Sequence, residues 1–71
     1  MTRQQVDRLR KGDTFIHDDY YVITDIYENC GNTYYEAELY EGEPDGCVLH
    51  STGRIEKFLK GDLMRRGVEK C

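Results

Sequence analysis

Two histidines are the side chains of this sequence best suited to acid–base chemistry, and each lies beside a group that such chemistry uses. His17 precedes Asp18 and Asp19, and His50 precedes Ser51. A catalytic pair must meet within hydrogen-bonding distance, whereas consecutive residues of a strand point to opposite sides. The sequence also lacks a glycine-rich phosphate loop and the H-E-x-x-H and G-x-S-x-G motifs. We therefore predict a non-enzymatic protein that needs no cofactor.

The three cysteines, Cys30, Cys47 and Cys71, form no pattern typical of a disulfide framework or a metal site. Secreted disulfide-rich domains usually contain an even number of cysteines, and zinc sites usually need closely spaced ligand pairs. We predict free thiols, no metal and a reducing, cytoplasmic location, with a Cys30–Cys47 bridge as the alternative. No stretch approaches the roughly 18 apolar residues of a membrane span, and no signal-peptide core follows Met1. No membrane association is expected.

The charged residues are divided sharply along the chain. Residues 12–53 contain ten carboxylates and no Lys or Arg, whereas all ten basic residues lie in 1–11 and 54–71. All six tyrosines lie inside the acidic block. Tyr adds rigid contact area at low entropic cost, and carboxylates attract cationic surfaces. The acidic block is therefore predicted to bind a basic partner.

The elements that position these residues fit a single small domain covering 1–71. Thr2 and Gln5 have the spacing of a capping box, which predicts a short helix over roughly residues 3–10. A short strand over 13–17, with its aromatic residue buried, is expected to follow.

The centre of the chain predicts a β-hairpin with strands over 20–28 and 33–40 and a turn at Gly31-Asn32. The second strand alternates between two faces. Its expected buried residues are Tyr35, Ala37 and Leu39. Its expected outward residues are Tyr34, Glu36, Glu38 and Tyr40. The first strand is expected to add Val22, Thr24 and Ile26 to the buried face.

Two registers of this hairpin stay open. A two-residue turn places Asp25 opposite Glu38, and a four-residue turn places it opposite Glu36. Either register opposes two carboxylates, which destabilises a sheet by roughly 0.2–1 kcal/mol. We interpret this cost as a sign that the acidic face has a use, the alternative being an ordinary solvated face.

The second half of the chain predicts a polar turn over 41–46 and a short strand over 47–50. A short helix capped by Ser51 or Thr52 is then expected from an apolar i, i+3, i+4 pattern. That pattern consists of Ile55, Phe58 and Leu59. The exposed side of the helix would carry a basic stripe of Arg54, Lys57 and Lys60. The tail over 63–69 is interpreted as a last strand.

Together these elements predict a mainly β (α+β) fold. The expected architecture is a small antiparallel sheet, or an SH3-like barrel, with a central three-strand meander. A short helix begins the fold and a second short helix precedes the last strand. An SH3-like architecture would carry no information about function.

The favoured functional hypothesis is a protein-interaction module that sets an acidic, Tyr-rich hairpin face against a basic partner. One version is a nucleic-acid mimic that inhibits a nucleic-acid enzyme of a host, as a phage or mobile element would encode. The residues predicted to bind the partner are Asp25, Tyr27, Tyr34, Glu36, Glu38, Tyr40, Glu41, Glu43 and Asp45.

The alternative hypothesis is a small β domain whose basic ends bind nucleic acid or a ribonucleoprotein. Its predicted contact residues are Arg8, Arg10, Lys11, Arg54, Lys57, Lys60, Arg65 and Arg66. We rank it second, because the aromatic residues that would stack on bases lie among carboxylates that repel phosphate. A third hypothesis is a homo-oligomer that joins acidic face to basic face.

Overall fold

The computed structural model describes residues 1–42 and 49–71. The elements are α1 (Arg3–Asp7), β1 (Thr14–His17), β2 (Asp19–Asn29), β3 (Asn32–Gly42), β4 (Leu49–Leu59), α2 (Lys60–Leu63) and β5 (Glu69–Lys70). The strands form one antiparallel sheet in the order β4-β3-β2-β1-β5. The predicted mainly β class is confirmed, with β2–β3–β4 as the central meander. The sheet is open, with β4 and β5 at its two edges, and does not close into a barrel.

Helix α1 begins with the predicted capping box. The Thr2 N–H donates to Gln5 Oε1 at 2.9 Å, and the Gln5 N–H donates to Thr2 Oγ1 at 3.2 Å. The helix is shorter than predicted and ends at Asp7. Val6 and Leu9 are both buried, so tertiary packing holds a helix that is too short to be stable alone.

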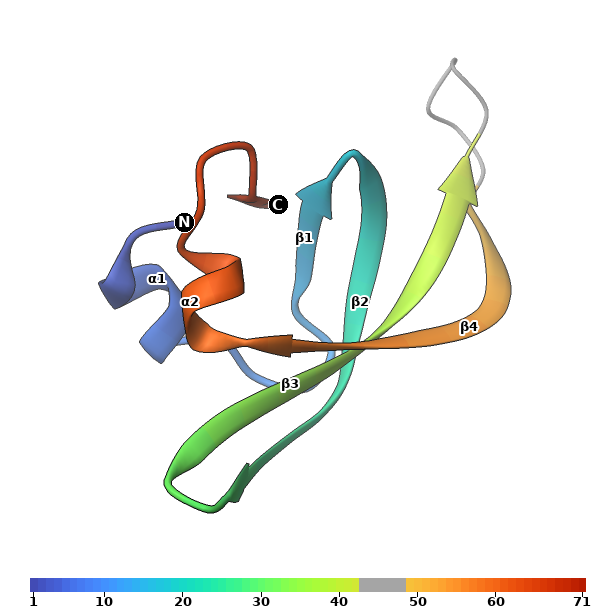
Figure 1. The fold of residues 1–71 in the computed structure, drawn as a ribbon. Helices are drawn as coiled ribbons and strands as arrows, with labels where there is room; N and C mark the ends of the chain where they lie inside the picture. Colours follow the sequence, from blue (N-terminus) through green and yellow to red (C-terminus); the bar gives the residue numbers. More distant parts are fainter. Residues whose placement is uncertain (43–48) are drawn as a thin grey trace.

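One hydrophobic core joins the sheet to both helices. Figure 1 shows α1, α2 and the C-terminal segment gathered on one side of the curved sheet. The buried core residues are Val6, Leu9, Phe15, Tyr21, Ile23, Tyr35, Ala37, Leu39, Leu63 and Val68. Phe15 stacks on Tyr21 with ring centroids 5.2 Å apart, and Phe58 meets both rings edge-on. We call this side of the sheet the inner face and the opposite side the outer face.

A β-bulge interrupts the pairing of β2 with β3. Ile23 pairs with Ala37 and Asp25 pairs with Glu36, which leaves Thr24 as an extra residue on β2. Of the two registers open from the sequence, the structure has the one that opposes Asp25 and Glu36.

The bulge also corrects the predicted inner face of β2. Tyr21 and Ile23 are buried before the bulge, and Ile26 packs against the core after it. The prediction was right for Ile26. It was wrong for Thr24, which is exposed, and for Val22, which is half-buried on the outer face. One inserted residue reverses the two-residue alternation on which the prediction rested.

The turn of the hairpin lies one residue earlier than the predicted Gly31-Asn32. Asn29 pairs with Asn32, so Cys30 and Gly31 form the loop. Both have positive φ, 53° and 81°. Two central residues with positive φ are the signature of a type I′ turn, whose twist suits a β-hairpin.

Strand β4 replaces the predicted helix after Ser51. Glu38 pairs with Ile55 and Tyr35 pairs with Phe58, so this segment continues the sheet. A short apolar pattern is ambiguous between helix and strand, and the partner strand decides the outcome. The predicted helical basic stripe is therefore absent, and the helix that precedes the last strand is α2.

The C-terminal segment returns to β1 beside α2. Leu63 and Val68 are buried, whereas Met64 is 41% exposed. The predicted last strand is reduced to the two residues of β5, which pair with β1. Cys30 and Cys71 are free and exposed. Cys47 and most of the predicted polar turn lie in 43–48, outside the described residues.

Candidate functional site

The outer face is the side of the sheet turned away from the core and the two helices. Strand pairing places fifteen side chains on it: Thr14, Ile16, Tyr20, Val22, Asp25, Tyr27, Tyr34, Glu36, Glu38, Tyr40, Ser51, Ile55, Lys57, Leu59 and Glu69. Six of the nine predicted partner-binding residues are among them: Asp25, Tyr27, Tyr34, Glu36, Glu38 and Tyr40. Antiparallel pairing of β2 with β3 is what brings these residues together.

The other three predicted partner-binding residues do not join this group. Glu41 pairs with His50 near the end of β3, and strand alternation puts its side chain on the inner side. Glu41 was predicted to lie in a turn at the end of the outer face, and it lies instead within β3, which ends at Gly42. Its contact with a partner stays a prediction. Glu43 and Asp45 lie outside the described residues.

The carboxylates of the outer face have cations at both sides. Asp25 and Glu36 oppose one another across β2 and β3, as the sequence predicted. Lys11 Nζ lies 3.3 Å from Asp25 Oδ1, and Lys57 of β4 pairs with Glu36 in register. The like-charge repulsion is thus reduced by two lysines that sequence reasoning had assigned to a different surface.

A pair of tyrosines forms the end of the outer face nearest the hairpin turn. The rings of Tyr27 and Tyr34 stack with centroids 5.5 Å apart and planes inclined by 25°. Lys57 Nζ lies over both rings, 5.7 Å from the centroid of Tyr27 and 5.4 Å from that of Tyr34. The Tyr27 hydroxyl donates to Glu36 Oε1 at 3.3 Å. The Tyr27 hydroxyl, and further the charge on Glu36, raise the pKa of Lys57.

The opposite end of the outer face is more apolar. Ile16 and Ile55 are 40% and 53% exposed, and Val22 lies half-buried between their strands. Tyr20 pairs with Tyr40 across β2 and β3. An open sheet face that exposes isoleucine beside tyrosine differs from a plain solvated face, on which polar residues dominate.

Five of the eight residues of the alternative nucleic-acid hypothesis lie beside carboxylates of the same chain. Lys11 and Lys57 lie at the carboxylates of the outer face. Three others are paired with carboxylates elsewhere: Lys60 with Asp7 at 2.7 Å, Arg54 with Glu56 at 3.6 Å, and Arg65 with Asp62 at 3.6 Å. The predicted stripe of Arg54, Lys57 and Lys60 depended on a helix that the structure replaces with a strand. These pairings reduce the positive charge available to a phosphate backbone, whereas Arg8, Arg10 and Arg66 are absent from the ion pairs of the described residues.

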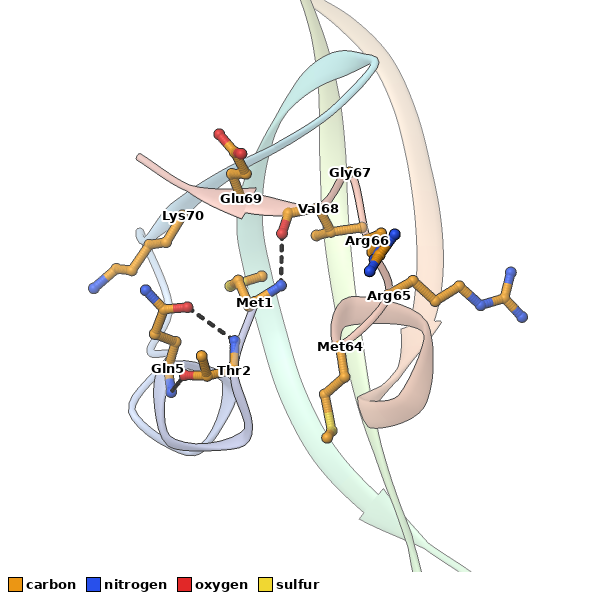
Figure 2. Close-up of a pocket in the computed structure, with 10 residues that line it drawn as sticks. All are labelled: Met1, Thr2, Gln5, Met64, Arg65, Arg66, Gly67, Val68, Glu69 and Lys70. Carbon is orange, nitrogen blue, oxygen red and sulfur yellow. Dashed lines mark hydrogen bonds between the residues drawn. The ribbon is translucent and has the colours of Figure 1, made fainter.

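A pocket with a volume of about 610 Å³ lies between the two ends of the chain (Figure 2). The Met1 ammonium donates to Val68 O at 2.6 Å and to Leu63 O at 3.0 Å. In Figure 2 the side chains of Arg65 and Lys70 point away from this centre. The polar groups that converge there are therefore already used by the fold. A second pocket, with a volume of about 520 Å³, lies between the hairpin turn and α2.

No concentration of metal ligands appears in the part of the chain that the structure describes. Within 1–42 and 49–71, no group of three or more His, Cys, Asp or Glu side chains is placed to hold a metal ion. Every buried side-chain nitrogen or oxygen there has a hydrogen-bond partner. Over the same ranges, no helix is long and apolar enough to cross a bilayer.

Sequence reasoning missed the contribution of β4 to the outer face. Ile55, Lys57 and Leu59 alternate with Glu56 and Phe58, which is the pattern of a strand with two different faces. That alternation was the available signal. The helical interpretation separated Lys57 from the tyrosines that it contacts.

The chain was compared with known proteins in three ways. No protein-family model, curated protein sequence or solved structure matches it.

Proposed function

We propose that this chain is a non-enzymatic interaction module whose outer face binds a basic surface of a partner protein. The observation that carries the proposal is the composition of that uncovered face. Four tyrosines and four carboxylates share it with exposed isoleucines. Aromatic residues anchor many protein interfaces, and charged groups around them steer association and select the partner.

The scattered basic residues support this proposal over direct nucleic-acid binding. Lys11, Lys60, Arg54 and Arg65 each face a carboxylate of the same chain. A nucleic-acid mimic receives less support than a general basic partner, because Lys11 and Lys57 lie beside two carboxylates of the face, Asp25 and Glu36. A mimic of a phosphate backbone would need a less interrupted row of negative charge.

The proposal is tested by reversing charge on one face at a time. In the first variant, Glu36→Lys and Glu38→Lys place two cations on the outer face. In the control, Glu28→Lys on β2 and Glu41→Lys on β3 make the same change in net charge. Strand alternation puts the control residues on the inner side, beyond the core.

Partners captured from the source cell by the wild-type protein are identified, purified and measured against both variants. We expect the outer-face variant to lose at least about tenfold in affinity, mostly through slower association, and the control to bind nearly as the wild type does. Wild-type binding should also weaken as salt increases. Equal losses in both variants would contradict the proposal. So would nucleic-acid binding that disappears only when Arg54, Lys57 and Lys60 are changed to Glu.

A further inference from the structure

The Tyr27–Tyr34 pair is a cation-binding arrangement that the chain fills with its own lysine. The two rings and the carboxylate of Glu36 present negative electrostatic potential at the same place on the outer face. Lys57 Nζ lies over both rings. Among the ion pairs of the described residues, none involves Lys57, although Glu36 is its cross-strand partner. The lysine therefore rests on the aromatic surface.

Two observations show that the cation–π contact of Lys57 is weak. Its ammonium lies 5.4 and 5.7 Å from the ring centroids, near the outer limit of about 6 Å for a cation–π contact. Lys57 is also exposed to solvent, so the contact competes with water. A better cation can displace it without disturbing the core, because all the groups involved lie on the outer face.

We infer that the Tyr27–Tyr34 pair, with Glu36, is the subsite that receives an arginine side chain of the basic partner, and that Lys57 is its internal competitor. This inference rests on the proposed function and adds the chemistry of recognition to it. A planar guanidinium can lie flat on a tyrosine ring and donate two hydrogen bonds to one carboxylate. It is also less strongly hydrated than the ammonium that it replaces. Arginine is therefore preferred over lysine at this position.

The inference is tested with a fluorescent nona-arginine peptide as the probe, at an ionic strength of about 0.15 M to reduce long-range attraction. Lys57→Met removes the competitor. Lys11→Met is the matched control, because it removes one positive charge from beside Asp25 on the same face. We expect Lys57→Met to bind the probe about two- to fivefold more tightly than Lys11→Met does.

A second pair of variants assigns the gain to the rings. Tyr27→Leu with Tyr34→Leu is combined with each lysine variant, and circular dichroism checks that every variant is folded. The advantage of Lys57→Met over Lys11→Met should disappear without the rings. In wild-type protein, binding of nona-arginine should move the Lys57 Hε resonances downfield, because the lysine leaves the shielding region of the aromatic rings.

The outcomes separate the inference from the proposed function. If the wild type and Lys57→Met both fail to bind the probe, the proposed binding of a basic partner is itself contradicted. If the wild type binds but Lys57→Met has no advantage over Lys11→Met, only the inference is wrong. An advantage that survives removal of both rings would mean that charge alone explains it. An equal advantage for a nona-lysine peptide would overturn the preference for arginine.

Discussion

Tyr21 joins the core to the Glu56 carboxylate on the inner face. Its ring stacks on Phe15, and its hydroxyl donates to Glu56 Oε2 at 2.6 Å. Burial and the Glu56 carboxylate raise the pKa of Tyr21 to about 12, from 10.0. The folded state therefore favours the neutral phenol of Tyr21, and ionisation of this phenol opposes folding.

This pKa predicts a specific loss of stability in alkali. The unfolded chain releases the Tyr21 proton near pH 10, whereas the folded chain keeps it until about pH 12. The stabilisation is complete below pH 10 and is lost as pH rises toward 12, by at most about 3 kcal/mol. The difference in unfolding free energy between wild type and Tyr21→Phe, measured with urea, should shrink over this range. A constant difference from pH 8 to pH 12 would contradict the assignment.

Ala37 tests the inner face at a single position. It is fully buried between Ile23 and Glu56 of the neighbouring strands. Ala37→Asp places a carboxylate in the core without a partner, and we expect it to lower the unfolding free energy by more than about 3 kcal/mol. Asn32→Asp is the control, because it adds the same charge at an exposed position of β3. Similar thermal denaturation of both variants would show that the faces are assigned wrongly.

At the level of elements, the hairpin turn makes an unusual use of cysteine. A type I′ turn favours Asn-Gly, and this chain has Cys30-Gly31 in the same backbone conformation. A non-glycine residue with positive φ costs roughly 1–2 kcal/mol, and asparagine tolerates it better than most. The turn is therefore functional as a hairpin connection but is not optimised for stability.

We expect Cys30→Asn to raise the unfolding free energy by about 0.5–1 kcal/mol and Gly31→Ala to lower it by about 1 kcal/mol. Gly61→Ala in α2 is the control, since an added methyl group there meets nothing within 4 Å and its φ is not positive. That control should be neutral or slightly stabilising. Chemical denaturation measures all three variants. Destabilisation by Cys30→Asn would mean that the thiol has a role beyond the turn.

The helices and strands could be predicted where the local sequence signal was strong. They could not be predicted where pairing with another strand decided the secondary structure. The capping box and the alternation of Tyr35, Ala37 and Leu39 are local, and both predictions were confirmed. The bulge at Thr24 and the strand around Ile55 arise from pairing with β3. The bulge leaves no distinct trace in a short window of sequence. The alternation around Ile55 was a signal, but the same residues also fit a helical spacing, so the partner strand decides the conformation.

For the whole molecule, the same limit explains how much of the candidate site was foreseen. Alternation along β3 placed Glu36 and Glu38 together correctly. The position of Lys57 could not be predicted without knowing that β4 pairs with β3. That pairing places a positive charge beside Glu36 on the acidic face. A chain that looked bipolar in sequence folds so that Lys11 and Lys57 from its basic ends lie beside Asp25 and Glu36 of its acidic centre. Oppositely charged residues that are far apart in the sequence are thus close together in the structure.

The two faces of the sheet are therefore expected to have separate roles, one in stability and one in binding. Leu63 is fully buried where α2 meets the core, whereas Ile55 is 53% exposed on the outer face. Leu63→Ala should lower the unfolding free energy by about 2–5 kcal/mol, enough to unfold much of a small domain. Ile55→Ala removes a similar aliphatic group and should change stability by no more than about 0.5 kcal/mol.

The effects of these two variants on partner binding should be in the reverse order. Ile55→Ala is expected to stay folded by circular dichroism and to weaken association with the captured partner, because it removes apolar area from the outer face. Leu63→Ala should keep its intrinsic affinity once the folded fraction is taken into account. It is measured at a temperature at which an excess of the partner restores folding of the variant. A partner that tolerates Ile55→Ala fully would place the interface elsewhere on the molecule. Strong destabilisation by Ile55→Ala would instead make the outer face part of the folding core, and the separation of roles would not hold.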